Sequence, residues 1–286
     1  MTTFTWESAW PAPAKLNLFL HVVGRRADGY HLLQTVFRFV DYGDCLRFTP
    51  RADGELRLAR PLPGVPPETD LTIRAARLLQ AETGCREGVE IEVDKRLPMG
   101  GGLGGGSSDA ATVLLALNHL WQLGLSRQRL QMLGLSLGAD VPVFLFGQNA
   151  FAEGVGEALR PVVLPPAWYV VLEPPVQVPT AAIFGAPELK RDTPAMRAGD
   201  WRSGVGGNDL ESVAVARYPV LAEYLTWLGQ FGPALMTGSG ACVFAPFADE
   251  DAAKAVLARL PEGMRGWMAA GLPMHPLHAL VRDGEV

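Results

Sequence analysis

The stretch Pro98-Met99-Gly100-Gly101-Gly102-Leu103-Gly104-Gly105-Gly106-Ser107-Ser108 decides the fold of this protein. Glycine lets the backbone turn its N–H groups inward and approach a ligand closely. A series of such amides that ends at a helix N-terminus binds anions, because the first helical N–H groups lack acceptors and carry partial positive charge. Nucleotide phosphates fit such a site best, and the hydroxyls of Ser107 and Ser108 are candidates to bind phosphate or Mg²⁺. We call residues 98–108 the glycine loop.

Regular elements flank the glycine loop on both sides. Residues 90–95 alternate apolar and charged side chains, and this period of two predicts a half-exposed strand of an antiparallel sheet. After the loop, helical spacing predicts a helix that has Ser107 or Ser108 as its N-cap and ends at Gly124. A flexible linker is not expected between two such elements. The apolar stripe of the predicted helix consists of Val113, Leu114, Leu117 and Leu120.

The glycine loop does not match the two commonest phosphate-binding patterns. Walker A requires a lysine after its second glycine, and this loop contains none. The Rossmann spacing is met by Gly100, Gly102 and Gly105, but a stretch this rich in glycine meets almost any glycine spacing. The preceding strand is charged on one face, whereas Rossmann strands are buried on both. Gln122 and Leu123 also stand where a Rossmann fold needs an acidic residue.

The rest of the chain predicts an α+β protein of two domains. Strands and helices mix without strict βαβ alternation, which favours the α+β class. A length of 286 residues suits two cores, and prolines cluster near 160–166, so we expect domains at 1–163 and 164–286. We expect strands at 14–23, 35–40, 45–49, 168–172 and 265–269, a glycine turn followed by a strand within 236–247, a turn at 24–30, and helices at 71–79, 126–138, 210–228 and 252–260.

Composition narrows the classes of partner. Hydrophobic residues make up 48% and charged residues 19%, which indicates a globular protein. The net charge of -5 argues against nucleic acid and anionic membranes as partners. Three widely spaced cysteines give neither a disulfide framework nor a zinc motif. The N-terminus lacks a signal-peptide pattern and no apolar stretch is long enough to span a bilayer, so we expect a cytoplasmic location; the oligomeric state is left open.

Three motifs together resemble the GHMP kinase superfamily: residues 98–110, residues 13–18 (PAKLNL) and residues 236–242 (MTGSGAC). Residues 26–31 (RADGYH) and 137–144 (LGADVPVF) are similar to the branch whose substrate is cytidine diphosphate methylerythritol. The resemblance implies an N-terminal domain like domain 2 of ribosomal protein S5, a ferredoxin-like C-terminal domain, and ATP with Mg²⁺ as cofactors. It also implies phosphorylation of the 2-hydroxyl of that small molecule, on the non-mevalonate route to isoprenoid precursors.

Asp140 and Lys15 are the candidate catalytic residues. The residues alone leave Asp140 open between a helix cap and a site carboxylate, and Lys15 open between a surface lysine and a ligand-binding cation. The resemblance implies that Asp140 takes the proton of the substrate hydroxyl and that Lys15 pairs with Asp140 and the transferred phosphoryl group. Where the superfamily often has Asn-Leu, this chain has Asp70-Leu71, and the metal ligands stay unassigned.

The remaining candidates concern the substrate. Asn17 shares a strand face with Lys15 and can bind a substrate hydroxyl or phosphate. The resemblance implies a cytosine pocket in which an aromatic ring stacks on the base, His31 reads the polar edge of the base and Phe184 is the opposing ring. The other expected or weaker members of the substrate and nucleotide sites are Tyr30, Thr180, Phe37, Lys95 and the turn 237–240.

Two alternatives remain at this point. Another GHMP kinase, of the homoserine or mevalonate type, would lack a cytidine pocket. A nucleotide-binding regulatory protein would bind ATP without turnover, and loss of the Asp140 carboxylate would then change nothing measurable.

Overall fold

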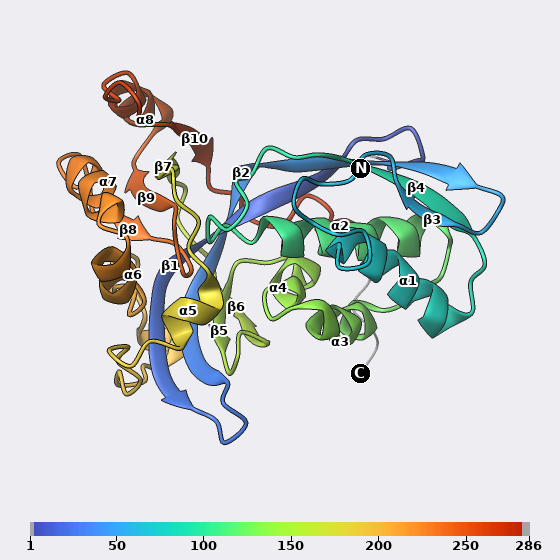
Figure 1. The fold of residues 1–286 in the computed structure, drawn as a ribbon, viewed down its shortest axis with the longest axis horizontal. Coiled ribbons are helices and arrows are strands. Elements are labelled where there is room, and N and C mark those ends of the chain that lie inside the picture. Colours follow the sequence, from blue (N-terminus) through green and yellow to red (C-terminus); the bar gives the residue numbers. More distant parts are fainter. Residues whose placement is uncertain (1–2, 282–286) are drawn as a thin grey trace.

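A computed structural model describes residues 3–281 and contains two sheets, each covered by helices (Figure 1). The larger sheet has the order β3-β4-β2-β5-β6, and β1 pairs with β2. Neighbouring strands are antiparallel except β3 and β4. This mixture confirms the expected α+β class. The strands are β1 (Trp10–Arg25), β2 (His31–Arg51), β3 (Leu56–Leu58), β4 (Gly88–Asp94), β5 (Ala150–Glu153) and β6 (Ala158–Pro161).

The long β1–β2 hairpin is more continuous than the sequence pattern predicted. The expected strands 35–40 and 45–49 are parts of the single strand β2, because pairing along β1 continues past the glycine at position 43. The register of β1 against β2 shifts between Pro13 and Lys15 and again between Asn17 and Leu20. Such bulges re-aim side chains. Lys15 and Asn17 are both buried, which removes the surface-lysine interpretation of Lys15.

Four helices lie together on one side of the larger sheet (Figure 1). The helix α3 begins after the predicted N-cap Ser126, whose hydroxyl accepts from the backbone of Arg129, and ends at Gly138 as expected. The helix α2 begins earlier than predicted, at Gly105, because Gly104 takes the N-cap position with a φ of 74°. The four are α1 (Leu71–Thr83), α2 (Gly105–Leu120), α3 (Arg127–Leu137) and α4 (Val141–Phe146), of which α4 was not predicted.

The second sheet has the antiparallel order β10-β7-β9-β8 and forms the C-terminal half. The predicted helix 210–228 is two helices, separated at Tyr218-Pro219, because proline cannot donate an N–H inside a helix. The elements of this half are β7 (Trp168–Leu172), α5 (Thr180–Phe184), the 3₁₀ turn Ala198–Asp200, α6 (Glu211–Arg217), α7 (Val220–Leu228), β8 (Leu235–Met236), β9 (Val243–Phe247), α8 (Glu250–Leu257), β10 (Gly266–Ala270) and the 3₁₀ turn His278–Leu280.

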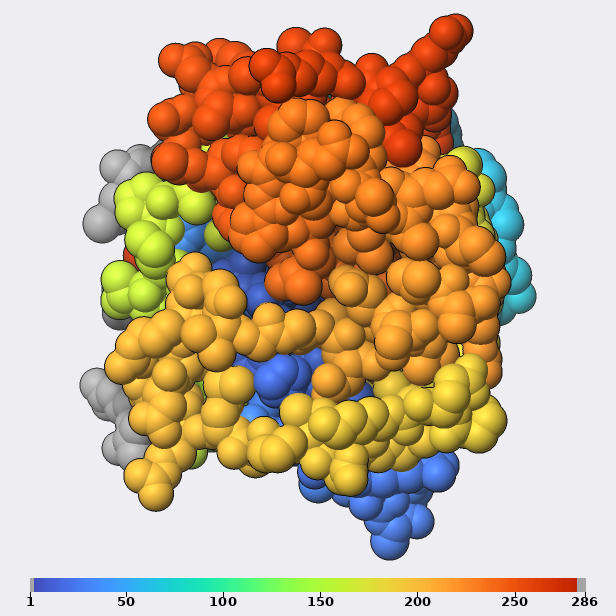
Figure 2. Space-filling model, turned by 90° about the vertical axis from the view of Figure 1, so that its left-hand side faces the viewer, coloured from blue at the N-terminus to red at the C-terminus, as the bar shows by residue number. Residues whose placement is uncertain are grey.

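The two halves are joined by exchanged segments. Leu20 and Val22 of β1 are buried in the core of the C-terminal half. Figure 2 looks onto that half (orange to red) and shows the end of the β1–β2 hairpin (blue) projecting beyond it. In return, the backbone N–H of Leu272 donates to Phe39, and Leu277 is buried in the N-terminal core. A division at 163/164 therefore stays a prediction. No helix among residues 3–281 is long and apolar enough to cross a membrane.

Replacing Asp70 tests a local determinant of this fold. Asp70 is buried, and its Oδ1 accepts the backbone N–H of Thr72 at 2.8 Å, which caps α1. We expect Asp70→Ala to lower the free energy of unfolding by about 1–2 kcal/mol, because the first turn of α1 loses its acceptor. Asp70→Asn keeps that acceptor and should lose much less. Denaturant unfolding of both variants measures the difference, and equal losses would contradict a capping role.

Candidate active site

A cavity of about 560 Å³ lies where the glycine loop, β1, α1 and the C-terminal half meet. Residues 98–107 of the glycine loop line it, together with Lys15 and Asp140. The C-terminal half contributes α5 and the turn 238–240. Segments from the two ends of the chain, such as those of Leu20 and Gly240, therefore line the same cavity. The other polar side chains that line the cavity are Asn17, Thr35, Thr69, Asp70, Thr72, Lys95, Asp109, Thr180 and Ser239.

The glycine loop is held by direct backbone contacts. Gly100, Gly102 and Gly104 adopt φ values of 71°, 75° and 74°, a region that side chains disfavour. A Cβ on Gly102 would lie 2.1 Å from the carbonyl oxygen of Thr237. The N–H groups of residues 241 and 242 donate to the carbonyls of Gly100 and residue 101, at 3.2 and 3.1 Å. The loop is therefore a fixed structure, as its sequence context predicted, and not a flexible linker.

The loop also places Lys15 beside the start of α2. The backbone N–H of Lys15 donates to the carbonyl of Leu103 at 3.0 Å. A Cβ on Gly104 would meet the side chain of Lys15 at 3.1 Å and that of Phe144 at 3.0 Å, and its φ of 74° disfavours any side chain, so glycine suits this position best. An ammonium group and the positive end of a helix dipole are thus brought to one wall of the cavity. Both favour a bound anion.

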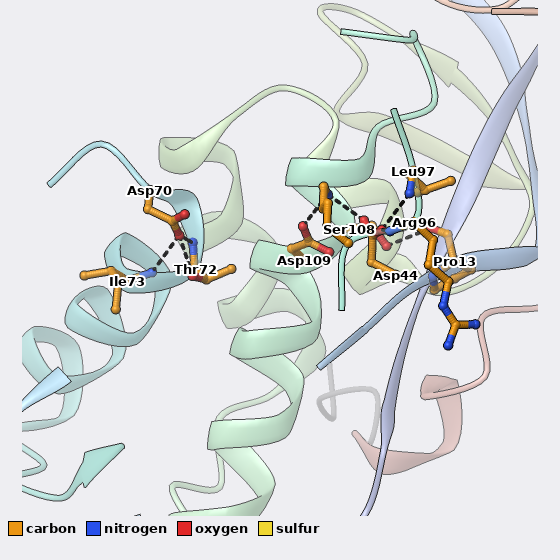
Figure 3. A network of polar contacts seen from close by, with 10 residues as sticks. Pro13, Asp44, Asp70, Thr72, Ile73, Arg96, Leu97, Ser108 and Asp109 are labelled. Atoms are coloured by element: carbon orange, nitrogen blue, oxygen red, sulfur yellow. Dashed lines mark hydrogen bonds and ion pairs between the residues drawn. The ribbon is translucent and has the colours of Figure 1, made fainter. Parts of the chain in front are cut away.

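The two serines of the loop differ in their surroundings. Ser107 lines the cavity, as a phosphate ligand should. Ser108 departs from the expectation: it is fully buried, its hydroxyl donates to the carbonyl of Pro13 at 2.7 Å and its N–H donates to Gly104 at 2.8 Å. Figure 3 shows this bond between α2 and β1. Ser108 fastens the helix to the strand and does not line the cavity, so its contact with a phosphate stays a prediction.

Lys15 and Asp140 form an ion pair at this wall. The distance from Nζ of Lys15 to Oδ2 of Asp140 is 3.2 Å. Asp140 stands at the N-cap position of α4, yet its side chain makes no capping hydrogen bond. That observation removes the helix-cap reading left open by the sequence. The side chain of Asp140 is 37% exposed and that of Lys15 is 3% exposed. Both line the cavity, so the carboxylate is the more accessible member of the pair.

Asn17 is fixed next to this pair. Its Oδ1 accepts from Nζ of Lys15 at 2.7 Å, and its Nδ2 donates to the hydroxyl of Thr35 at 3.0 Å. The hydroxyl of Thr237 accepts the backbone N–H of Asn17 at 3.0 Å. One amide hydrogen of Asn17 remains free for a ligand. The turn 237–240 therefore contacts Asn17, beside the catalytic candidates, as well as the glycine loop.

A second lysine, Lys95, lines the same cavity between two buried carboxylates. Its Nζ is 2.5 Å from Oδ2 of Asp44 and 2.6 Å from Oδ2 of Asp109. Asp44 also accepts the N–H groups of residues 96 and 97 (Figure 3). Burial lowers the pKa of Lys95, but the two carboxylates raise it more, so the ammonium stays charged. Burial raises the pKa of Asp109 from 3.8 to about 7, opposed by Lys95 and reinforced by Asp44.

The raised pKa of Asp109 predicts a pH-dependent stability. The folded state holds a proton on Asp109 that the unfolded state releases above pH 3.8, so folding is weakened as the pH rises from about 4 to 7. We expect Asp109→Asn to increase the free energy of unfolding by about 2 kcal/mol at pH 8 and to change it little at pH 5, because the amide still accepts from Lys95. Urea unfolding at both pH values measures this. Asp94→Asn, at an exposed ion pair with Arg96, is the control. A variant that is less stable than the parent at pH 8 would contradict the prediction.

The expected substrate side chains are only partly brought together. Thr180 and Phe184 of α5 line the cavity, and the hydroxyl of Thr180 lies 2.7 Å from that of Ser239. His31 does not line the cavity, but its ring contacts that of Phe184, with centroids 5.0 Å apart. Tyr30 is 62% exposed and also stands outside the lining residues. Its place in a base pocket stays a prediction.

Sequence reasoning missed three residues that the structure connects to this site. Asp44 and Asp109 hold Lys95, and Arg191 donates to both His31 and the segment that carries Phe184. Asp109 directly follows Ser108 of the glycine loop, and a charge next to that loop was an available signal. Arg191 lies in a charged run, Lys190-Arg191-Asp192, that resembles any solvated loop. Nothing in the sequence distinguishes it.

Comparisons with known proteins agree on one group of enzymes. Residues 70–148 match the family described as GHMP kinases N terminal domain, and residues 189–266 match GHMP kinases C terminal. The chain is 68% identical to the 4-diphosphocytidyl-2-C-methyl-D-erythritol kinase of Dechloromonas aromatica, over 94% of this chain and 98% of that protein. It is 65% identical to the protein of that name from Thiobacillus denitrificans, over 97% and 100% of the two chains.

Solved structures give the same result for the fold. The crystal structure of a 4-(cytidine 5'-diphospho)-2C-methyl-D-erythritol kinase superimposes with a TM-score of 0.80 at 37% identity, over 92% of this chain and 99% of that one. A mevalonate kinase superimposes with a TM-score of 0.68 at 14% identity, over 94% and 99%. The second likeness concerns the fold alone.

Proposed function

Since the chain belongs to the GHMP kinases and, within them, to the family of the 4-diphosphocytidyl-2-C-methyl-D-erythritol kinases, we propose that it transfers the γ-phosphoryl group of ATP to the 2-hydroxyl of 4-diphosphocytidyl-2-C-methyl-D-erythritol. The products are the 2-phosphate and ADP, in the non-mevalonate route to isoprenoid precursors. The observation that carries the proposal is the ion pair of Lys15 and Asp140 on the wall of the cavity that the glycine loop lines.

Asp140 is the general base of the proposed reaction. Its carboxylate makes no capping bond and faces the cavity, so it is available to accept the proton of the substrate hydroxyl. As that proton leaves, the oxygen forms a bond to the γ-phosphorus, and the bond from phosphorus to the bridging oxygen of ATP breaks. ADP keeps the electron pair of the broken bond.

Lys15 and the start of α2 hold the charge of the transferred group. Lys15 is buried, its ammonium is fixed by Asn17 and Asp140, and it cannot swing into solvent. A fixed cation in a site shielded from water stabilises developing charge without reorganising. The first N–H groups of α2 add the partial positive charge of a helix N-terminus. Together they take the place of the lysine that a Walker A loop carries within its own motif.

Mg²⁺ fits the residues present as a partner of the ATP phosphates. It needs one or two protein oxygens, since water and phosphate supply the rest, and no group of three or more candidate ligands exists among residues 3–281. The hydroxyl of Ser107 and the unpartnered, buried Oδ1 of Asp109 are the oxygen donors where the glycine loop meets α2. The ion would supply positive charge to the phosphates.

A coupled assay of ADP release tests the proposed function. We expect the purified protein with Mg²⁺ and ATP to release ADP when the cytidine diphosphate alcohol is added, and not when homoserine or mevalonate replaces it. CMP should inhibit by competing for the pocket that Phe184 lines. Equal turnover with homoserine or mevalonate would favour another GHMP kinase activity.

A further inference from the structure

One arginine joins the two side chains that are expected to hold the cytosine base. The Nε of Arg191 donates to Nε2 of His31 at 3.0 Å, and its Nη2 donates to the carbonyl of Phe184 at 3.0 Å. Two further bonds reach the carbonyls of Ala186 and Leu189, at 2.6 and 2.8 Å. A single guanidinium group therefore fastens a ring from β2 to the end of α5, which lie in different halves of the molecule.

The bond between Arg191 and His31 decides which ring nitrogen carries a proton. A guanidinium group stays charged and offers only donors, so Nε2 of His31 must accept and cannot carry hydrogen. The neutral ring then carries its hydrogen on Nδ1. Burial lowers the pKa of His31, and the charges of Arg191 and Arg25 lower it further. At neutral pH the ring is therefore a fixed Nδ1–H donor.

The contact between His31 and Phe184 limits where a base can lie. Their centroids are 5.0 Å apart with an angle of 35° between the planes. Aromatic pairs in contact have centroids about 4.5–7 Å apart, so the two rings already touch and leave no layer between them for a third ring. A base that stacks on Phe184 must use its cavity side. His31 is then available to contact the edge of that base.

We propose that Arg191 is a positioning residue that fixes His31 as an Nδ1–H donor, and that this donor makes the site select cytosine over uracil. The inference rests on the proposed function, since it concerns the base of that substrate. N3 of cytosine is an acceptor, whereas N3 of uracil carries a hydrogen. A fixed donor therefore forms a hydrogen bond with N3 of cytosine, whereas it meets the hydrogen on N3 of uracil and forms none. A site built around one hydrogen bond rejects the mismatched partner strongly, because a polar group is left unpaired.

Arg217 is a matched control that tests whether Arg191 has a purely structural role. Arg217 also fastens α5: its Nη1 donates to the carbonyl of Ala182 at 2.8 Å, and it pairs with Glu188 at 2.9 Å. Its side-chain bonds go to Glu188 and Ala182 and not to His31. If Arg191 serves only to hold α5, then Arg191→Met and Arg217→Met should act alike. If it acts through His31, base selection should change in the first variant alone.

Steady-state kinetics with the cytidine and the uridine forms of the substrate separate these outcomes. We expect Arg191→Met to raise the KM of the cytidine substrate about tenfold, with kcat and the KM of ATP within about twofold of the parent. The preference for cytidine over uridine should fall about tenfold, and should be unchanged in Arg217→Met. Arg191→Lys should recover part of the loss. An unchanged base preference in Arg191→Met overturns the proposal.

A second measurement needs no variant of Arg191. Nitrogen-15 NMR of the histidine-labelled wild-type protein, with His31 assigned by its absence in His31→Gln, should show hydrogen on Nδ1 and none on Nε2. Hydrogen on Nε2 overturns the proposal even if Arg191→Met does not fold. Absence of turnover by the wild-type protein with the cytidine substrate would contradict the proposed function instead, and the NMR result would still decide the role of Arg191.

Discussion

Asp140→Asn is expected to lower kcat by about 10²–10⁴-fold, the range of general-base catalysis. The amide has nearly the shape of the carboxylate but cannot take the proton of the substrate hydroxyl. It also leaves the charge of Lys15 without its carboxylate partner at 3.2 Å. The affinity for ATP should change by less than about threefold, because the contacts of the glycine loop are untouched. Turnover by stopped or coupled assay and ATP binding by calorimetry measure the two quantities separately.

The control for Asp140 is a carboxylate of the same type on the surface. Asp53 pairs with Arg51 at an exposed turn, and Asp53→Asn should leave both kcat and ATP affinity at parental values. Normal turnover in Asp140→Asn would remove the proposed mechanism and favour the regulatory, non-catalytic alternative. Loss of ATP affinity together with turnover would assign Asp140 to nucleotide binding instead.

Gly102→Ala is expected to have the largest effect on the glycine loop. The residue adopts a φ of 75°, and the new methyl group would lie 2.1 Å from the carbonyl of Thr237. Neither backbone can withdraw easily, because neighbouring N–H groups of the 241–242 segment bind the same loop. We expect a loss of at least about 3 kcal/mol in the free energy of unfolding, and loss of measurable turnover where the protein still folds.

Gly106→Ala is the matched control in the same motif. Its Cβ would meet only Leu71, at an ordinary distance of 3.6 Å, and the residue lies within the first turn of α2. Alanine there should be neutral or slightly stabilising for the free protein. Thermal unfolding of both variants makes the comparison. If Gly102→Ala were as stable as Gly106→Ala, the close packing of the loop on the 237–240 turn would be wrong.

Local elements were predictable where one physical signal dominated. The helix α3 was bounded correctly because Ser126 caps it and Gly138 ends it. The start of α2 was misplaced because serine normally caps helices, whereas Gly104 takes that position and Ser108 bonds to Pro13 instead. The helix α4 was missed because a short apolar segment has no period to measure. Tertiary packing therefore decided where α2 begins and that α4 forms.

The sequence by itself determined the α+β class and a structured glycine loop between a strand and a helix, because these follow from residue type and local spacing. The candidates Lys15 and Asp140 came from the family resemblance, since the residues alone left both open. Only the tertiary structure decided that Asp140 is not a cap, that Asp109 and Asp44 share Lys95, and that Arg191 donates to His31. The partners in these contacts are separated by 14 residues for Lys95 and Asp109 and by 160 residues for His31 and Arg191. Charge pairing and proton placement depend on distances of a few ångströms, and such distances exist only after distant segments have packed.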